Sequence, residues 1–169
     1  MQLIGRELDR EIMDAVEGQY ELTMLGLSPI HWFSGWPVRE LPLSGSVVYT
    51  IWDRSGVFVY AGMAGRNVTT STKSKGPFGR LESHASGRRS GDQFNIYVCD
   101  RFVLPCMHNR IPEIAEGRLS LDQMTREFIR AELGFRFVAV ASPAEAFALE
   151  RRLQRGEWPS GRPVLNPVM

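Results

Sequence analysis

Two tyrosines in neighbouring strand-like segments are the first residues whose types and spacing suggest chemistry. Tyr49 lies in the run 47–52 and Tyr60 in the run 57–63, and both runs are rich in β-branched and aromatic residues. The residues between the runs end at Gly56 in a pattern typical of a hairpin turn. We therefore expect the two phenols to lie close to opposite one another and to face one site. The alternative is a pair of ordinary strand aromatics.

Two further candidates lie on a short helix that the sequence predicts from near Pro77 to near Gly87. Arg80 and His84 are four residues apart and therefore share one face of that helix, which Arg88 continues as a basic stripe. A guanidinium can bind phosphate through two hydrogen bonds, and an imidazole can gain or lose a proton near neutral pH. A solvated helix face is the alternative interpretation.

One glutamate occupies the apolar side of a predicted helix. Ser142 and Glu145 form a capping box that starts this helix. Its apolar stripe is formed by Ala146, Leu149 and Leu153. Glu150 falls inside the same sector, where an unpaired carboxylate is costly, and it has no evident structural task. The patterning leaves this carboxylate unexplained; pairing with a buried arginine such as Arg136 is one interpretation, and a functional role is the other.

The remaining pattern predicts an α/β (α+β) chain in which a hairpin is followed by interleaved helices and strands. The expected elements are an acidic helix over 7–18, an irregular arm over 26–45, a third strand within 92–104, helical or irregular chain over 105–118, a helix from Ser120 to Gly134 and a further strand over 135–141. Trp32, Phe33 and Trp36 are expected to anchor the arm by packing, and a platform for stacking bases is the alternative. Residues 1–45 would thus form a helix and arm on a core domain of residues 46–169.

The composition is that of one ordinary globular domain. The chain has 169 residues, of which 43% are hydrophobic and 23% charged. It contains no apolar run long enough for a membrane span, and its first residues lack the pattern of a secretory signal. We therefore expect a cytoplasmic protein without a membrane partner. Cys99 and Cys106 suggest a reducing compartment and buried thiols; a metal site that combines them with His108 is a weak alternative, because there is no CxxC pair.

Positive charge is concentrated in one segment of a nearly neutral chain. The formal net charge is +1, but residues 66–89 carry six basic residues against one acidic residue. A basic segment of this kind can bind a phosphate backbone, and a solvated loop is the alternative. The candidate nucleic-acid contacts are Arg66, Lys73, Lys75, Arg88 and Arg89.

In their order along the chain, these features resemble the GIY-YIG nuclease family. The first motif is spelled Val47-Val48-Tyr49 and the second Tyr60-Ala61-Gly62. The resemblance extends from about residue 46 to residue 167 and leaves the N-terminal arm uncovered. The residues that match the family's site are Tyr49, Tyr60, Arg80, His84, Glu150 and, before a proline near the C-terminus, Asn166. Met63 and Ala64 stand where some members have a lysine, so the general base must be another residue.

The resemblance implies a small three-stranded sheet flanked by helices and a metal-dependent cleavage of phosphodiester bonds, usually in DNA. Glu150 would be the single protein ligand of Mg²⁺ or Mn²⁺, and Arg80 would stabilise the phosphate charge. Tyr49 would take the proton of the attacking water, alone or together with His84, if Arg80 lowers the pKa of the phenol. Tyr60 would position the water or the phosphate.

Several alternatives remain open at this point. The substrate could be RNA, and the pathway could be restriction, defence or repair. A double-strand break would require a homodimer or two successive nicks. A non-catalytic nucleic-acid-binding module on the same fold, or a protein-interaction domain, would account for the same sequence without cleavage.

Overall fold

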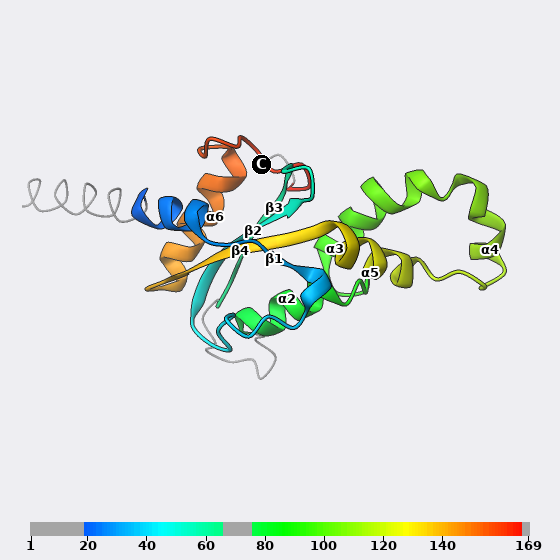
Figure 1. Cartoon of the computed structure of the whole chain (residues 1–169), viewed down its shortest axis with the longest axis horizontal. Helices are drawn as coiled ribbons and strands as arrows, with labels where there is room; N and C mark the ends of the chain where they lie inside the picture. The colour runs from blue at the N-terminus through cyan, green and yellow to red at the C-terminus, as the bar shows by residue number, and fades with distance from the viewer. Residues whose placement is uncertain (1–18, 66–75, 167–169) are drawn as a thin grey trace, which may run out of the picture.

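The computed structural model describes residues 19–65 and 76–166, which form an α+β fold around an open antiparallel sheet of four strands (Figure 1). The strands are β1 (His31–Trp32), β2 (Ser46–Asp53), β3 (Phe58–Ala64) and β4 (Leu133–Val140), in the spatial order β1-β4-β2-β3. The α+β class and the β2–β3 hairpin are confirmed. The expectation of three strands is wrong, because two residues of the arm add the short strand β1. Two residues are too few for an alternating pattern to reveal a strand.

Helices follow the hairpin and connect it to β4. They are α2 (Pro77–Ala85), α3 (Gln93–Val98), the π-helical turn η2 (Cys99–Val103), the 3₁₀ turns η3 (Leu104–Cys106) and η4 (His108–Arg110), α4 (Ile111–Ala115), α5 (Leu121–Glu132) and, after β4, α6 (Pro143–Arg155). A further 3₁₀ turn, η1 (Phe33–Gly35), follows β1, and residues 19–27 are helical. The acidic helix predicted over 7–18 lies outside the described residues.

The two faces of the sheet are covered by different helices (Figure 1). One face packs against α2, α3 and α5 in a core that includes Val47, Tyr49, Ile51, Leu81, Phe94, Val98 and Ile129. The opposite face packs against α6 and the helical residues 19–27, through Val48, Ala61, Met63, Leu22, Leu25, Ala146, Leu149 and Leu153. The alternation of side chains along a strand places Tyr49 in the first core and its neighbour Val48 in the second.

The strand predicted within 92–104 is wrong, because this segment forms α3 and the turn η2. Its Phe, Ile, Tyr and Val residues favour strands, but the buried Phe94 and Val98 are four residues apart, as on one face of a helix. Asp92 caps this helix by accepting a hydrogen bond from the backbone nitrogen of Phe94 at 3.1 Å. The spacing and the cap therefore override the strand propensity.

Local signals at the other helices are confirmed. The hydroxyl of Ser142 accepts from the backbone nitrogen of Glu145 at 3.1 Å, and the Glu145 carboxylate accepts in return from the nitrogen of Ala141 at 2.9 Å. Ser120 likewise caps α5. The chain enters β4 directly at Leu133, two residues before the predicted strand and without a loop at Gly134.

The arm contributes to the core of the domain. Phe33 is fully buried, and Trp36 packs against the same cluster. The predicted role of these aromatic residues as anchors is thus confirmed.

The chain from η2 to α4 projects away from the sheet around a third small core (Figure 1). Cys99 is buried in that core, but Cys106 is exposed, contrary to the expectation of two buried thiols. Within the described ranges, no helix has the length and apolar character needed to cross a membrane.

Candidate active site

The hairpin places Tyr49 and Tyr60 on the same face of the sheet. Tyr49 pairs with Gly62 across the two strands, and Ile51 pairs with Tyr60. The two tyrosines are therefore diagonal neighbours and not directly opposite, and their ring centroids are 6.5 Å apart. The expectation that both phenols face one region is confirmed.

The last residue of the second motif, Gly62, lies where the ring of Tyr49 leaves no room for a side chain. The ring of Tyr49 lies across its partner, so that a Cβ atom at position 62 would stand 2.5 Å from Cζ of Tyr49 and closer still to the phenol oxygen. That approach is much shorter than van der Waals contact. The missing side chain therefore allows Tyr49 to turn its hydroxyl toward α2.

A chain of hydrogen bonds leads from Tyr49 through His84 to Asp92. The phenol oxygen lies 2.8 Å from Nε2 of His84, and Nδ1 of His84 lies 2.7 Å from Oδ2 of Asp92. Tyr49 and His84 are fully buried, and Asp92 is 2% exposed. An ionised carboxylate can only accept, so the hydrogen of a neutral His84 belongs on Nδ1. Nε2 then accepts the hydrogen bond from Tyr49.

The charges of this chain follow from its burial. Burial lowers the pKa of His84 below its ordinary value of 6.5, although the neighbouring Asp92 opposes the change. For Asp92, burial would raise the pKa, but its hydrogen bond with His84 and the positive charge of Arg80 act in the opposite direction, and the pKa is lowered. At neutral pH the pair therefore consists of a neutral imidazole and an ionised carboxylate.

Asp92 is the site residue that the sequence analysis missed. It lies eight residues after His84, and the chain between them turns at Gly87, whose φ is 67°. A helix predicted over 93–98 would have indicated Asp92 as its cap. Its second role, as the partner of His84, depends on how closely α2 and α3 approach.

Arg80 faces the two phenols from the same side of α2 as His84, as predicted from the four-residue spacing. Its guanidinium lies close enough to Tyr49 and Tyr60 to oppose the rise of the pKa of both phenols. Burial would lower the pKa of Arg80, but the two phenols and Asp92 raise it, so the charge is permanent. Arg88 does not continue this face, because α2 ends at Ala85 and Arg88 lies on the exposed loop beyond it.

The expected activation of Tyr49 by Arg80 is wrong in this structure. Burial raises the pKa of Tyr49 well above its ordinary value of 10.0, the neighbouring Tyr60 raises it further, and Arg80 offsets only part of this effect. Burial likewise raises the pKa of Tyr60 to about 12. Both phenols are therefore protonated at neutral pH, because the loss of hydration outweighs the nearby positive charge.

Glu150 lies on α6 near the same two phenols. Its side chain is half-buried, whereas Ala146 and Leu149 of the same helix are fully buried. Its negative charge adds to the rise in the pKa of both Tyr49 and Tyr60, after the larger effect of burial. The arginine considered as its alternative partner, Arg136, donates to the carbonyl oxygens of Gly26 and Ser28.

The donor set of the site limits which metal it could hold. No group of three or more His, Cys, Asp or Glu side chains with a metal-binding arrangement occurs in the part of the chain that the structure describes. A zinc site of the usual four protein ligands would need such a group. Mg²⁺ retains most of its water shell and often binds through one or two carboxylates. A single carboxylate such as Glu150 fits that second type of ion.

Asn166 binds the backbone of β3. Its Oδ1 accepts from the backbone nitrogen of Ala61 at 2.7 Å, and its Nδ2 donates to the carbonyl oxygen of the same residue at 2.9 Å. The backbone nitrogens of Val164 and Leu165 also donate to β3, at Phe58 and Val59. Asn166 therefore attaches the C-terminal segment beside Tyr60.

The basic residues predicted to contact nucleic acid are described only in part. Arg66, Lys73 and Lys75 lie outside the described residues. Arg89 forms an ion pair with Asp122 at 2.8 Å, which neutralises part of its charge, whereas Arg88 is exposed to solvent.

Comparisons of the chain with protein-family models, with curated proteins and with solved structures give no match. The geometry of the side chains is therefore the basis for assigning a function.

Proposed function

We propose that the chain is a metal-dependent endonuclease of the GIY-YIG type that hydrolyses phosphodiester bonds in DNA. The observation that supports this proposal most strongly is the convergence of five side chains from β2, β3, α2 and the start of α3. Arg80 lies beside two phenols, and one of these phenols, Tyr49, is hydrogen-bonded to the buried pair of His84 and Asp92. Such a group combines a fixed positive charge with a route for a proton, and hydrolysis of a phosphodiester needs both.

Arg80 is suited to bind the phosphate that is cleaved. Its charge is permanent, and it lies beside Tyr49 and Tyr60. A preorganised guanidinium can stabilise the additional negative charge of a pentavalent phosphate without reorganising. In this role Tyr60 holds the guanidinium in place and borders the substrate, since 8% of its surface is exposed.

Tyr49 and His84 would act in series on the proton of the attacking water. The phenol oxygen would receive that proton while its own proton passes to Nε2 of His84. The Asp92 carboxylate would then stabilise the imidazolium that forms. This route needs no phenolate, which agrees with the raised pKa of Tyr49. The two candidates for the general base would thus be two members of one relay.

Glu150 would hold Mg²⁺ or Mn²⁺, with water filling most of the coordination shell. When bound, the ion would neutralise charge on the phosphate and stabilise the leaving 3′ oxygen. Arg88, together with the sequence-predicted contacts Arg66, Lys73 and Lys75, would bind the backbone of the nucleic acid. RNA as substrate and a homodimer for double-strand cleavage remain part of the proposal as alternatives.

A second candidate function is a nucleic-acid-binding module without catalysis. The observation in its favour is that Tyr49 and His84 are both fully enclosed, so the relay would serve only to fix Arg80. Such a module would bind DNA through Arg80 and would not require a divalent ion.

Cleavage of supercoiled plasmid in the presence of Mg²⁺ or Mn²⁺ tests the proposal. We expect the full chain to convert plasmid to nicked or linear forms and to stop when EDTA is added. Glu150→Gln should abolish the conversion, while the matched control Glu132→Gln, at an exposed position of α5, should retain it. Circular dichroism would verify that both variants fold. Full activity of Glu150→Gln would exclude the assignment, and metal-independent binding without cleavage would support the second candidate.

A further inference from the structure

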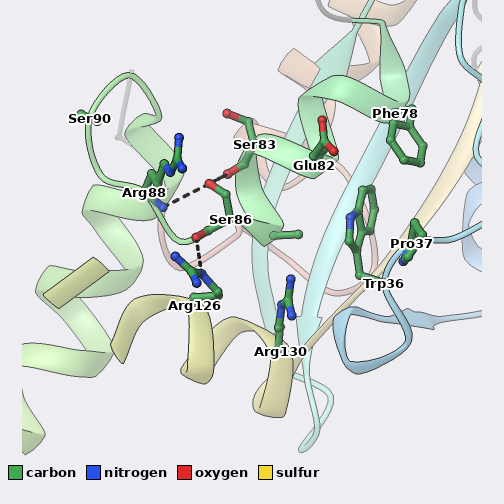
Figure 2. Close-up of a pocket in the computed structure, with 11 residues that line it drawn as sticks. Trp36, Pro37, Phe78, Glu82, Ser83, Ser86, Arg88, Ser90, Arg126 and Arg130 are labelled. Carbon is green, nitrogen blue, oxygen red and sulfur yellow. Dashed lines mark hydrogen bonds between the residues drawn. The ribbon is translucent and has the colours of Figure 1, made fainter. Parts of the chain in front are cut away.

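A second concave site lies on the other side of α2. It is a cleft of about 760 Å³ between the arm, α2, the loop that follows α2, and α5 (Figure 2). Glu82 and Ser86 border the cleft, and at ~100° per residue they project from the side of α2 roughly opposite to Arg80 and His84. The cleft is thus separated by a helix from the site described above.

One wall of the cleft is basic. Arg126 and Arg130 rise from α5, and Arg88 comes from the loop after α2 (Figure 2). Nε of Arg126 donates to the carbonyl oxygen of Ser86 at 2.8 Å, which holds the guanidinium in place and leaves its terminal nitrogens for other acceptors. Among the described residues, no ion pair engages Arg88 or Arg130.

The loop that carries Arg88 is itself held in position. The side-chain nitrogen of the buried Asn95 donates to the carbonyl oxygen of Arg88 at 2.9 Å, and the backbone nitrogen of Arg88 donates to the hydroxyl of Ser86 at 3.2 Å. The basic wall therefore presents guanidinium groups from two fixed backbones. This arrangement suits an anion with several oxygen atoms, such as phosphate.

The opposite wall is aromatic. Trp36 and Phe78 pack against each other with ring centroids 5.1 Å apart, and both remain half-exposed toward the cleft. Glu82 is drawn beside Phe78, to its left in Figure 2, and is exposed. Half-exposed rings of this type offer a stacking surface for a planar heterocycle, and a carboxylate beside them can accept hydrogen bonds from its N–H groups.

We propose that this cleft binds an unpaired nucleotide, with the phosphate toward Arg88, Arg126 and Arg130 and the base against Trp36 and Phe78. Phosphate and aromatic base are the two parts of a nucleotide, and the two walls provide one surface for each. The nucleotide can be free or part of a strand. The second case rests on the proposed function, since the cleft would then hold an unpaired nucleotide of the nuclease substrate next to the cutting site.

Binding measured without divalent ions tests the proposal independently of cleavage. The probe is a fluorescein-labelled single strand of about ten nucleotides, followed by fluorescence anisotropy with the full chain in EDTA. Unlabelled nucleoside monophosphates, inorganic phosphate and a blunt duplex of the same sequence serve as competitors. We expect a nucleoside monophosphate to compete at least fivefold better than inorganic phosphate, because only the nucleotide can also stack on the aromatic wall.

Substitutions on the basic wall assign the binding to this cleft. Arg88→Ala and Arg130→Ala should each weaken strand binding by about fivefold or more and reduce the dependence of log Kd on log salt by about one. The matched control Arg101→Ala removes an exposed arginine of η2 outside the cleft and should bind like the wild type.

Two results would overturn the inference. The first is that Arg88→Ala and Arg130→Ala bind the labelled strand as tightly as Arg101→Ala does. The second is that inorganic phosphate competes as well as the nucleoside monophosphates. Strands that bind much more tightly than mononucleotides would identify a nucleic acid as the source of the nucleotide, and equal affinities would identify a free nucleotide. Glu132→Gln, at an exposed position outside the cleft, should bind as the wild type does. The binding assay contains EDTA and involves no cleavage, so failure of the nuclease assay would leave this result intact. Loss of nucleotide binding would likewise leave plasmid cleavage to be judged separately.

Discussion

Nδ1 of His84 donates its hydrogen to Oδ2 of Asp92 across 2.7 Å, and the two side chains are buried together. Replacing Asp92 by Ala would leave a buried N–H group without an acceptor and would remove the cap of α3. We expect Asp92→Ala to lower the free energy of unfolding by about 2–4 kcal/mol, as measured by urea denaturation. Asp100→Ala, at an exposed position of η2, is the matched control and should change it by less than about 0.5 kcal/mol. Equal effects of both substitutions would show that the His84–Asp92 contact contributes little.

The lowered pKa of His84 predicts a stability that falls in weak acid. Below the ordinary value of 6.5 the unfolded chain binds a proton at this histidine, whereas the folded chain, in which the pKa is lower, does not. The unfolded state is then favoured as the pH falls, by up to about 1.4 kcal/mol per pH unit. Denaturation between pH 6.5 and 4.5 measures this slope in a range above the ordinary pKa of Asp92, which is 3.8.

Two substitutions identify the histidine responsible for this slope. His84→Gln should reduce the slope, and His108→Gln, which replaces an exposed histidine of η4, should retain it. If His84→Gln is too unstable for the measurement, the imidazole resonances of the wild type provide the same information, because His84 should stay neutral at pH 6.5. A slope that disappears with His108→Gln would contradict the prediction.

The close approach of Tyr49 to Gly62 predicts that a single added methyl group disturbs the site. In Gly62→Ala the new Cβ overlaps the phenol, so the ring must move away from His84. We expect a loss of about 1–3 kcal/mol in the free energy of unfolding, typical of overpacking in a core. Gly35→Ala is the control, because a Cβ there meets no atom within 4 Å. A wild-type stability of Gly62→Ala would mean that the ring of Tyr49 has room to move.

The permanent charge of Arg80 beside the two phenols predicts that its loss affects turnover and not affinity. Under the proposed function, Arg80→Ala should lower kcat for plasmid cleavage by about 10²–10³-fold, as expected for the loss of one charge-stabilising donor. Arg80→Lys should restore only part of it, because an ammonium cannot contact both phenols and a phosphate in the same way. A change confined to KM would instead identify Arg80 as a binding residue, and Arg101→Ala serves as the control.

The part of the fold that could be predicted is the part with strong local signals. The hairpin is marked by two β-rich runs and Gly56, and α6 is marked by the capping box of Ser142 and Glu145. The strand β1 and the helix α3 carry weaker or conflicting signals. The two residues of β1 depend on pairing with β4, which lies about a hundred residues further along the chain.

The parts of the candidate site that could be predicted are those that depend on a single helix or hairpin. The four-residue spacing predicted that Arg80 and His84 point the same way, and the hairpin predicted a common face for the tyrosines. The burial of Tyr49 and the pairing of His84 with Asp92 depend on how α2 and α3 close over the sheet. For that reason the sequence suggested a lowered pKa for Tyr49, whereas enclosure raises it.

The attachment of residues 164–166 to β3 has a consequence for self-association. β3 is the last strand of the sheet, and a strand in that position offers free backbone groups to any other extended chain. Here the backbone nitrogens of Val164 and Leu165 donate to the carbonyl oxygens of Phe58 and Val59. The side-chain amide of Asn166 bonds to both the nitrogen and the carbonyl oxygen of Ala61. The protein thereby saturates part of this edge with its own backbone and makes templated aggregation along β3 less favourable.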